Sequence, residues 1–147
     1  MTKYEHKQIG HIVIWGLLIL MAISAVGAVF QSSYRPETIL IVSIVLLIAL
    51  VLFYRLTITI DDENLCVSFG IGIISKRVPI AEIVACEPIR IRWWYGWGIH
   101  LTPYGWLYNV SGLDAVTITL SDGRKFALGT DDPQGLLDAI QRSIGQA

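Results

Sequence analysis

The chemically most distinctive side chains lie between residues 89 and 108, where the sequence reads IRIRWWYGWGIHLTPYGWLY. Two arginines alternate with isoleucines at its start, so both guanidinium groups are expected on one face of a strand. Aromatic rings and arginine dominate the energetic centres of protein interfaces, and they also favour the headgroup layer of membranes. The sequence predicts an interaction surface here, with these candidate residues: Arg90, Arg92, Trp93, Trp94, Tyr95 and Trp97.

Three roles remain open for these rings. Some of them, Trp97 and Trp106 in particular, are expected to fill the core of a small β domain. Others could lie in a headgroup layer or bind a protein partner. Trp93, Trp94 and Tyr95 are consecutive, and successive side chains of a strand point to opposite faces. At least one of the three should therefore be exposed.

Side chains suited to catalysis or metal binding are sparse. His100 is the only histidine beyond the first 11 residues, and it lies on an expected strand. The sequence shows no Ser-His-Asp arrangement, paired-carboxylate spacing or glycine-rich phosphate loop. Asp131 and Asp132 suggest a cation site, but helix capping is the simpler role for Asp132. We therefore expect no enzyme activity, no catalytic residues, no cofactor and no bound metal.

Charge and cysteine content limit the partners that the chain can bind. Three basic and two acidic residues give residues 1–54 a charge of +1, and eight basic and ten acidic residues give residues 55–147 a charge of −2. No basic surplus is present to neutralise a run of phosphates, so nucleic acid is not an expected partner. Cys66 and Cys86 lack the spacing of a disulfide framework or metal site, which fits a reducing compartment.

The positioning elements begin with two uncharged, apolar stretches. Residues 9–30 form one of 22 residues, and residues 38–54 form one of 17. At about 1.5 Å per residue the first reaches roughly 33 Å as a helix, enough to cross a hydrocarbon core of about 30 Å. Backbone amides in a bilayer must bond internally, so both stretches are predicted to be transmembrane helices. The short polar linker between them predicts an antiparallel hairpin.

A cleavable signal peptide is the alternative for the first stretch, because Lys3 and Lys7 precede it and residues 25–28 resemble a cleavage site. However, a signal peptide's apolar region is usually about 7–15 residues long, and a second apolar stretch follows closely. Two retained helices are the preferred interpretation. Arg55 also flanks the hairpin, whereas the linker contains only Arg35. The positive-inside bias therefore places both termini in the cytoplasm of a multi-pass membrane protein.

After the hairpin, the hydrophobic pattern changes to the alternation of short β-strands. Residues 97–101 and 106–110 are expected to form a hairpin, and the Asp-Gly pair within residues 121–124 is the strongest hairpin signal in the chain. Asp132 and Pro133 predict the start of a C-terminal amphipathic helix.

The sequence thus predicts an α+β protein in two parts. Residues 1–54 are assigned to an N-terminal tail and the transmembrane helical hairpin. Residues 55–147 are assigned to a small β-sandwich or barrel of about seven strands, capped by the C-terminal helix.

Two segments resemble the pleckstrin-homology-like (PH-like) domains of bacterial membrane-bound proteins. One is RLTITIDDENLCVSFGIGIISKRVPIAEI (55–83), and the other is DAVTITLSDGRKFALGTDDPQGLLDAI (114–140). The resemblance implies a PH-like fold and a non-enzymatic, membrane-tethered interaction module. Phosphoinositide binding, familiar in eukaryotic PH domains, needs clustered Lys and Arg at the first strand–strand loop. Here that loop is Asp61–Asn64, which argues against this ligand.

Two functions are compatible with these features, and the first is the preferred interpretation. In the first, the domain binds a protein partner, or a second copy of itself, at the cytoplasmic face of the membrane. In the second, it binds lipid or senses the bilayer through the aromatic and arginine side chains of residues 90–97.

Overall fold

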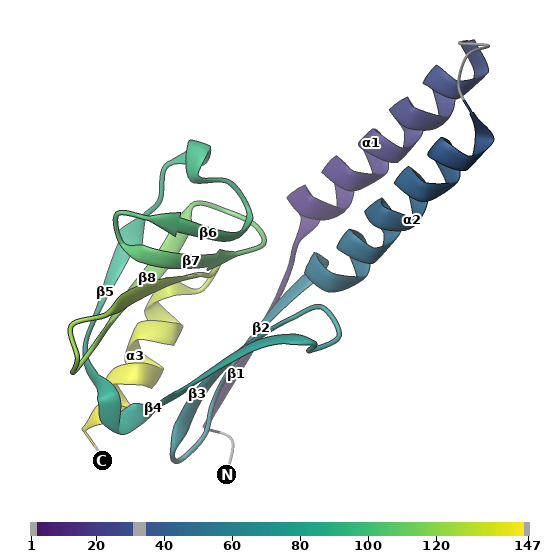
Figure 1. Cartoon of the computed structure of the whole chain (residues 1–147). Helices are drawn as coiled ribbons and strands as arrows, with labels where there is room; N and C mark the ends of the chain where they lie inside the picture. The colour runs from purple at the N-terminus through teal and green to yellow at the C-terminus, as the bar shows by residue number, and fades with distance from the viewer. Residues whose placement is uncertain (1–2, 31–34, 146–147) are drawn as a thin grey trace.

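In the computed structural model, which describes residues 3–30 and 35–145, the chain begins with a strand and not with a membrane helix. Strand β1 (Tyr4–Ile9) is followed by helices α1 (His11–Phe30) and α2 (Pro36–Phe53), and then by strand β2 (Arg55–Ile60). Figure 1 shows the two helices side by side, projecting away from the β domain that contains both chain termini. The helical hairpin is therefore inserted between two strands.

Both helices have the length and composition of membrane spans. Helix α1 has 20 residues and α2 has 18, which correspond to about 30 Å and 27 Å. Pro36 lies in the first turn of α2, where its missing N–H costs nothing. Trp15, Ile19 and Ile23 are 64%, 56% and 62% exposed, so these helices do not form the core of a soluble domain.

The N-terminal tail belongs to the first β-sheet. Strand β1 pairs antiparallel with β2, from Tyr4 opposite Ile60 to Ile9 opposite Arg55. Strands β3 (Asn64–Phe69) and β4 (Ile74–Pro79) complete the order β1-β2-β3-β4. The expected division at residue 54 thus differs from the structure, because residues 4–9 are part of the β domain. Their polar sequence, YEHKQI, gives little strand signal because β1 lies at the edge of the sheet.

The second sheet has five strands in the order β5-β8-β9-β7-β6. Their bounds are β5 (Ile83–Arg90), β6 (Gly98–Thr102), β7 (Gly105–Asn109), β8 (Asp114–Leu120) and β9 (Lys125–Gly129). Strands β7 and β9 are parallel, and the other neighbours are antiparallel. Both expected hairpins, β6–β7 and β8–β9, are confirmed. Two short 3-10 helices, η1 (Ile80–Glu82) and η2 (Trp93–Tyr95), precede and follow β5.

The main core lies between the two sheets and helix α3 (Pro133–Ile144). Phe69 and Phe126 are among its largest buried side chains, and Leu136 and Ile140 complete it from α3. The Asp132 side chain caps α3 by accepting the Gly135 N–H at 3.0 Å, as the sequence indicates. The predicted α+β class is confirmed.

The sheets do not close into a barrel. Residues 55–145 form eight strands instead of about seven and β1 adds a ninth, and within the described residues no strand pair links the four-stranded sheet to the five-stranded one. Pro79, which has no N–H to donate, ends β4, and the chain turns through η1 into β5. The domain is therefore built from two separate sheets.

The hairpin joins the domain through short, tightly packed connections. Single residues, Gly10 and Tyr54, link strand to helix on each side, and the Gly10 N–H donates to the Tyr54 carbonyl at 2.8 Å. The Gln8 side chain donates to the Ser111 carbonyl at 2.9 Å. A Cβ atom on Gly10 would lie 3.1 Å from both the Phe53 carbonyl oxygen and the Val110 Cβ. The base of the hairpin is thus packed against the loop that follows β7.

Strand β1 also contacts the start of α3. The His6 ring lies against the Asp131 carboxylate, and the Tyr4 hydroxyl donates to Asp132 at 3.5 Å. Partial burial and the Asp132 carboxylate raise the pKa of Tyr4 to about 12. Cleavage after residue 28 would remove β1 together with these contacts, which argues against the signal-peptide interpretation.

Gly70 provides a test of the packing between the hairpin and the first sheet. Its φ is +52°, and a Cβ atom there would lie 2.2 Å from the Val51 carbonyl oxygen at the end of α2. Gly72, with φ +92°, has open space around it. Gly70→Ala is expected to lower the free energy of unfolding by about 2 kcal/mol more than Gly72→Ala, because only the first variant adds a main-chain clash to the strain of positive φ. Thermal unfolding in detergent measures the stability of both variants. Equal unfolding midpoints for the two would contradict this packing.

Candidate functional site at the base of the helical hairpin

The predicted interaction residues lie on a loop with a firmly anchored start. This aromatic–arginine loop, residues 90–97, begins at the last residue of β5. Ile91 is only 3% exposed and packs in a small core cluster with Leu107 and Ala115. Its N–H donates to the Leu113 carbonyl at 2.7 Å. Because Ile91 is fixed inside, the flanking Arg90 and Arg92 are both exposed, but Arg92 lies beyond the end of β5, so the two do not share one strand as expected.

Helix η2 presents two tryptophans to the outside. Trp93 is 69% exposed and Trp94 is 55% exposed. Their ring centres are 5.9 Å apart in an edge-to-face arrangement, and the Arg92 guanidinium carbon lies 4.9 Å from the centre of the Trp94 ring. Gly96, with φ +73°, ends the turn in a conformation that glycine adopts without strain. The result is one exposed group that combines apolar rings with a positive charge.

The remaining rings of the segment take different roles. Tyr95 is half-buried and packs against the Ile91 cluster. Trp97 is also half-buried, and its indole N–H has no hydrogen-bond partner within the described residues. Trp106, expected in the core, is instead 49% exposed, whereas the next residue on β7, Leu107, is fully buried on the opposite face. Of the three consecutive rings, two are exposed, which satisfies the expectation of at least one.

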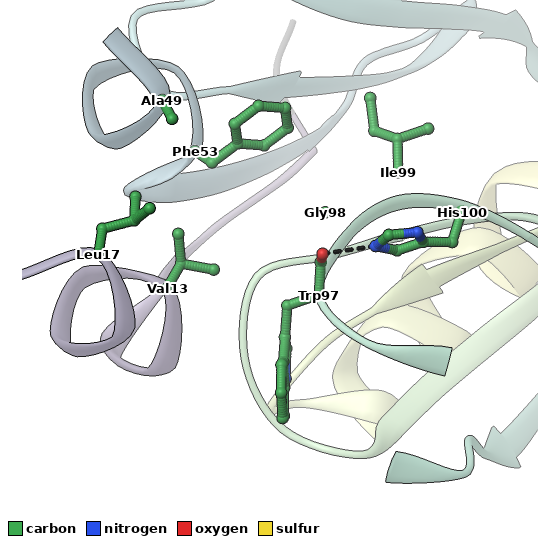
Figure 2. Close-up of a pocket in the computed structure, with 8 residues that line it drawn as sticks. All are labelled: Val13, Leu17, Ala49, Phe53, Trp97, Gly98, Ile99 and His100. Atoms are coloured by element: carbon green, nitrogen blue, oxygen red, sulfur yellow. Dashed lines mark hydrogen bonds between the residues drawn. The ribbon is translucent and has the colours of Figure 1, made fainter. Parts of the chain in front are cut away.

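Immediately after the loop, the chain lines a hollow between the domain and the helical hairpin (Figure 2). The hollow has a volume of about 300 Å³. Figure 2 shows the Trp97 side chain turned away from the helices, so its main chain forms part of the wall. The His100 ring donates from Nε2 to the Trp97 carbonyl oxygen at 2.6 Å. The lining residues are Val13 and Leu17 of α1, Ala49 and Phe53 of α2, and Trp97, Gly98, Ile99 and His100.

No local sequence signal marks this hollow. Its helical and domain walls come from segments separated by more than forty residues, and they meet only because β1 and β2 pair across the hairpin. An apolar helix residue such as Ala49 carries no signal that distinguishes it from its neighbours in the span.

The aromatic–arginine loop lies at the end of the domain that faces the hairpin. Helix η2 ends at Tyr95, two residues before Trp97 in the wall of the hollow. The exposed Trp94 and Trp93 precede Trp97 by three and four residues, a stretch of chain that spans at most about 11 to 14 Å. Figure 1 shows η2 as the short coil between β5 and β6 at the upper end of the five-stranded sheet, with the loop that leads into β6 lying between it and the helices.

Charge is distributed unevenly between the two ends of the domain. Residues 88–113, which include the loop and the β6–β7 hairpin, contain two arginines and one histidine, and the exposed Asp114 that follows them lies opposite Arg90 in the β5–β8 pair. The acidic turn 61–63 lies at the other end of β2, away from the hairpin. In this turn the Asp61 carboxylate accepts the N–H groups of Glu63 and Asn64 at 2.9 Å and 2.6 Å, which lower its pKa. The hairpin end thus carries two arginines beside one carboxylate, whereas the turn at the opposite end carries three carboxylates, so an anionic surface is disfavoured more strongly at the opposite end.

The arrangement is suited to binding apolar and anionic groups. Within the part of the chain that the structure describes, no cluster of three or more His, Cys, Asp or Glu side chains could hold a metal ion. The chain matches no protein-family model, no curated protein and no solved structure. The function is therefore inferred from the residues and geometry of this protein.

Proposed function

We propose that this protein is a membrane-anchored, non-enzymatic interaction module of the PH-like type. Helices α1 and α2 span the membrane as a hairpin, and the β domain lies at its cytoplasmic surface. Two observations support this proposal. The apolar surfaces of both helices are uncovered, and the helices are connected to neighbouring, paired strands of one sheet. Lys7 and Arg55, on the two strands that lead into the hairpin, supply the positive flank of a cytoplasmic end.

The PH-like assignment is supported by the order of the elements. Strands β6 and β7 form an additional hairpin at the edge of the second sheet. Without this hairpin, and with β1, which the sequence did not predict, the domain has seven strands followed by one C-terminal amphipathic helix. The helical hairpin is a second insertion, between the first two strands.

The function that the geometry supports best is contact with the bilayer through the aromatic–arginine loop. The observation that carries it is the exposure of Trp93 and Trp94 at the hairpin end of the domain. Tryptophan is favoured at headgroup depth because one part of its ring system is apolar and its N–H is polar. Arg90 and Arg92 would each contribute about 1 kcal/mol near anionic lipid. The loop then attaches the domain to the membrane at a second point, through contact with the lipid headgroups.

Depth-dependent fluorescence quenching tests this contact in the full-length protein. Variants that keep one tryptophan and replace the other four with Phe are reconstituted in vesicles containing brominated phospholipid. The Trp94 variant is expected to be quenched strongly, because its ring lies in the headgroup and upper acyl layer. The matched control keeps Trp106, which is similarly exposed at 49% but belongs to the β6–β7 hairpin. Equal quenching of the two variants would contradict the proposed contact.

A protein partner is the second candidate function, and a separate observation favours it. A groove of about 380 Å³ lies between β5 and α3. Val84, in its wall, is 58% exposed. Within the described residues β5 pairs only with β8, so its other edge is open to a strand from another chain. The walls include Cys86, Glu87, Gln141 and Ile144.

A photo-cross-linking amino acid at position 84 of the full-length protein tests this second candidate in cells. A discrete protein adduct is expected if the groove binds a partner chain. The control places the same amino acid at Leu101, which is 71% exposed on β6. A position-84 adduct pattern identical to that of the control would remove the groove as a specific site.

A further inference from the structure

We propose that the hollow at the base of the hairpin is a binding site for one acyl chain of a membrane lipid. The inference rests on the proposed membrane insertion of α1 and α2, and it adds a ligand site distinct from the exposed loop. Both walls of the site are present in one chain: the helices supply one wall, and residues 97–100 at the start of β6 supply the other.

The depth of the site identifies its surroundings. Leu17 lies six residues after the start of α1, and Ala49 lies four residues before the end of α2. At 1.5 Å per residue these positions are about 9 Å and 6 Å along the helices from their domain ends. With the hairpin inserted, this part of the hollow reaches the level of the upper acyl chains, and its open side meets lipid.

The lining selects an apolar occupant over water. Val13, Leu17 and Phe53 offer no hydrogen-bonding side-chain group, and the His100 Nε2 atom is already bonded to the Trp97 carbonyl oxygen. Water occupies a cavity only where it finds two or more polar partners. An empty hollow would forfeit dispersion contacts along both walls. A hydrocarbon chain restores those contacts without needing any polar partner.

The size of the hollow matches part of one acyl chain and not a whole lipid molecule. A volume of about 300 Å³ holds about ten groups of the size of a water molecule. That corresponds to a segment of a single acyl chain, with the glycerol and headgroup outside. Since the aromatic–arginine loop ends at Trp97, the headgroup of the same lipid would lie next to the exposed rings.

Photo-cross-linking in vesicles tests the site with a defined probe. The full-length protein is reconstituted with phosphatidylcholine that carries a diazirine on one acyl chain, and adducts are mapped by mass spectrometry. Adducts are expected on residues 97–100 of the domain as well as on the outer faces of α1 and α2. Ala49→Phe, which fills the hollow, should reduce the adducts on residues 97–100 at least fivefold. Ala22→Phe makes the same change on an exposed face of α1 and should leave them unchanged.

The outcomes separate this site from the proposed function. Adducts on the helices without adducts on residues 97–100 would overturn the acyl-chain site and leave membrane insertion intact. Adducts on residues 97–100 that persist in Ala49→Phe would also overturn it, because the chain would then reach β6 by another route. Absence of adducts on the helices themselves would overturn membrane insertion, and with it the proposed function.

Discussion

The pairing of β1 with β2 across the helical hairpin is the interaction on which the rest of the structure depends. Six residues on each strand are in register, and single residues connect the strands to the helices. The hydrogen bond between Gly10 and Tyr54 closes the ladder at the first turn of the hairpin. A hairpin attached at only one end could swing freely, whereas this one continues the ribbon of a packed sheet. The direction of the helices is therefore tied to the domain.

This connection explains why one end of the domain differs chemically from the other. It brings the start of β6 against the helix bases, and the exposed Trp93 and Trp94 lie on the loop that leads into β6. The acidic turn 61–63 lies at the opposite end of the same ribbon. In the proposed orientation at an anionic membrane, the domain would present Trp93, Trp94 and the two arginines to lipid and the acidic turn 61–63 to water. Attraction of the arginines to anionic lipid and repulsion of the acidic turn from it would then favour the same orientation.

Local signals in the sequence predict most of the elements, and non-local pairing accounts for what they miss. The apolar helices, the Asp-Gly hairpin and the Asp132 cap follow from periodicity and turn chemistry. Strand β1 does not, because its residues are polar and its partner lies beyond the hairpin. The parallel pairing of β7 with β9 is likewise non-local. Residue types identify the aromatic–arginine loop, but the hollow depends on segments that meet only in the folded chain.

Cross-strand disulfide formation in native membranes tests the central pairing most directly. Lys7 lies opposite Thr57, whereas Glu5 is two residues out of register with Thr57. In a background with Cys66 and Cys86 changed to Ser, Lys7→Cys with Thr57→Cys should form an intramolecular disulfide under mild oxidation, because directly opposed residues are within bonding distance. Glu5→Cys with Thr57→Cys should form little. Failure of the first pair to cross-link, or equal cross-linking of both, would contradict a sheet that continues through the hairpin.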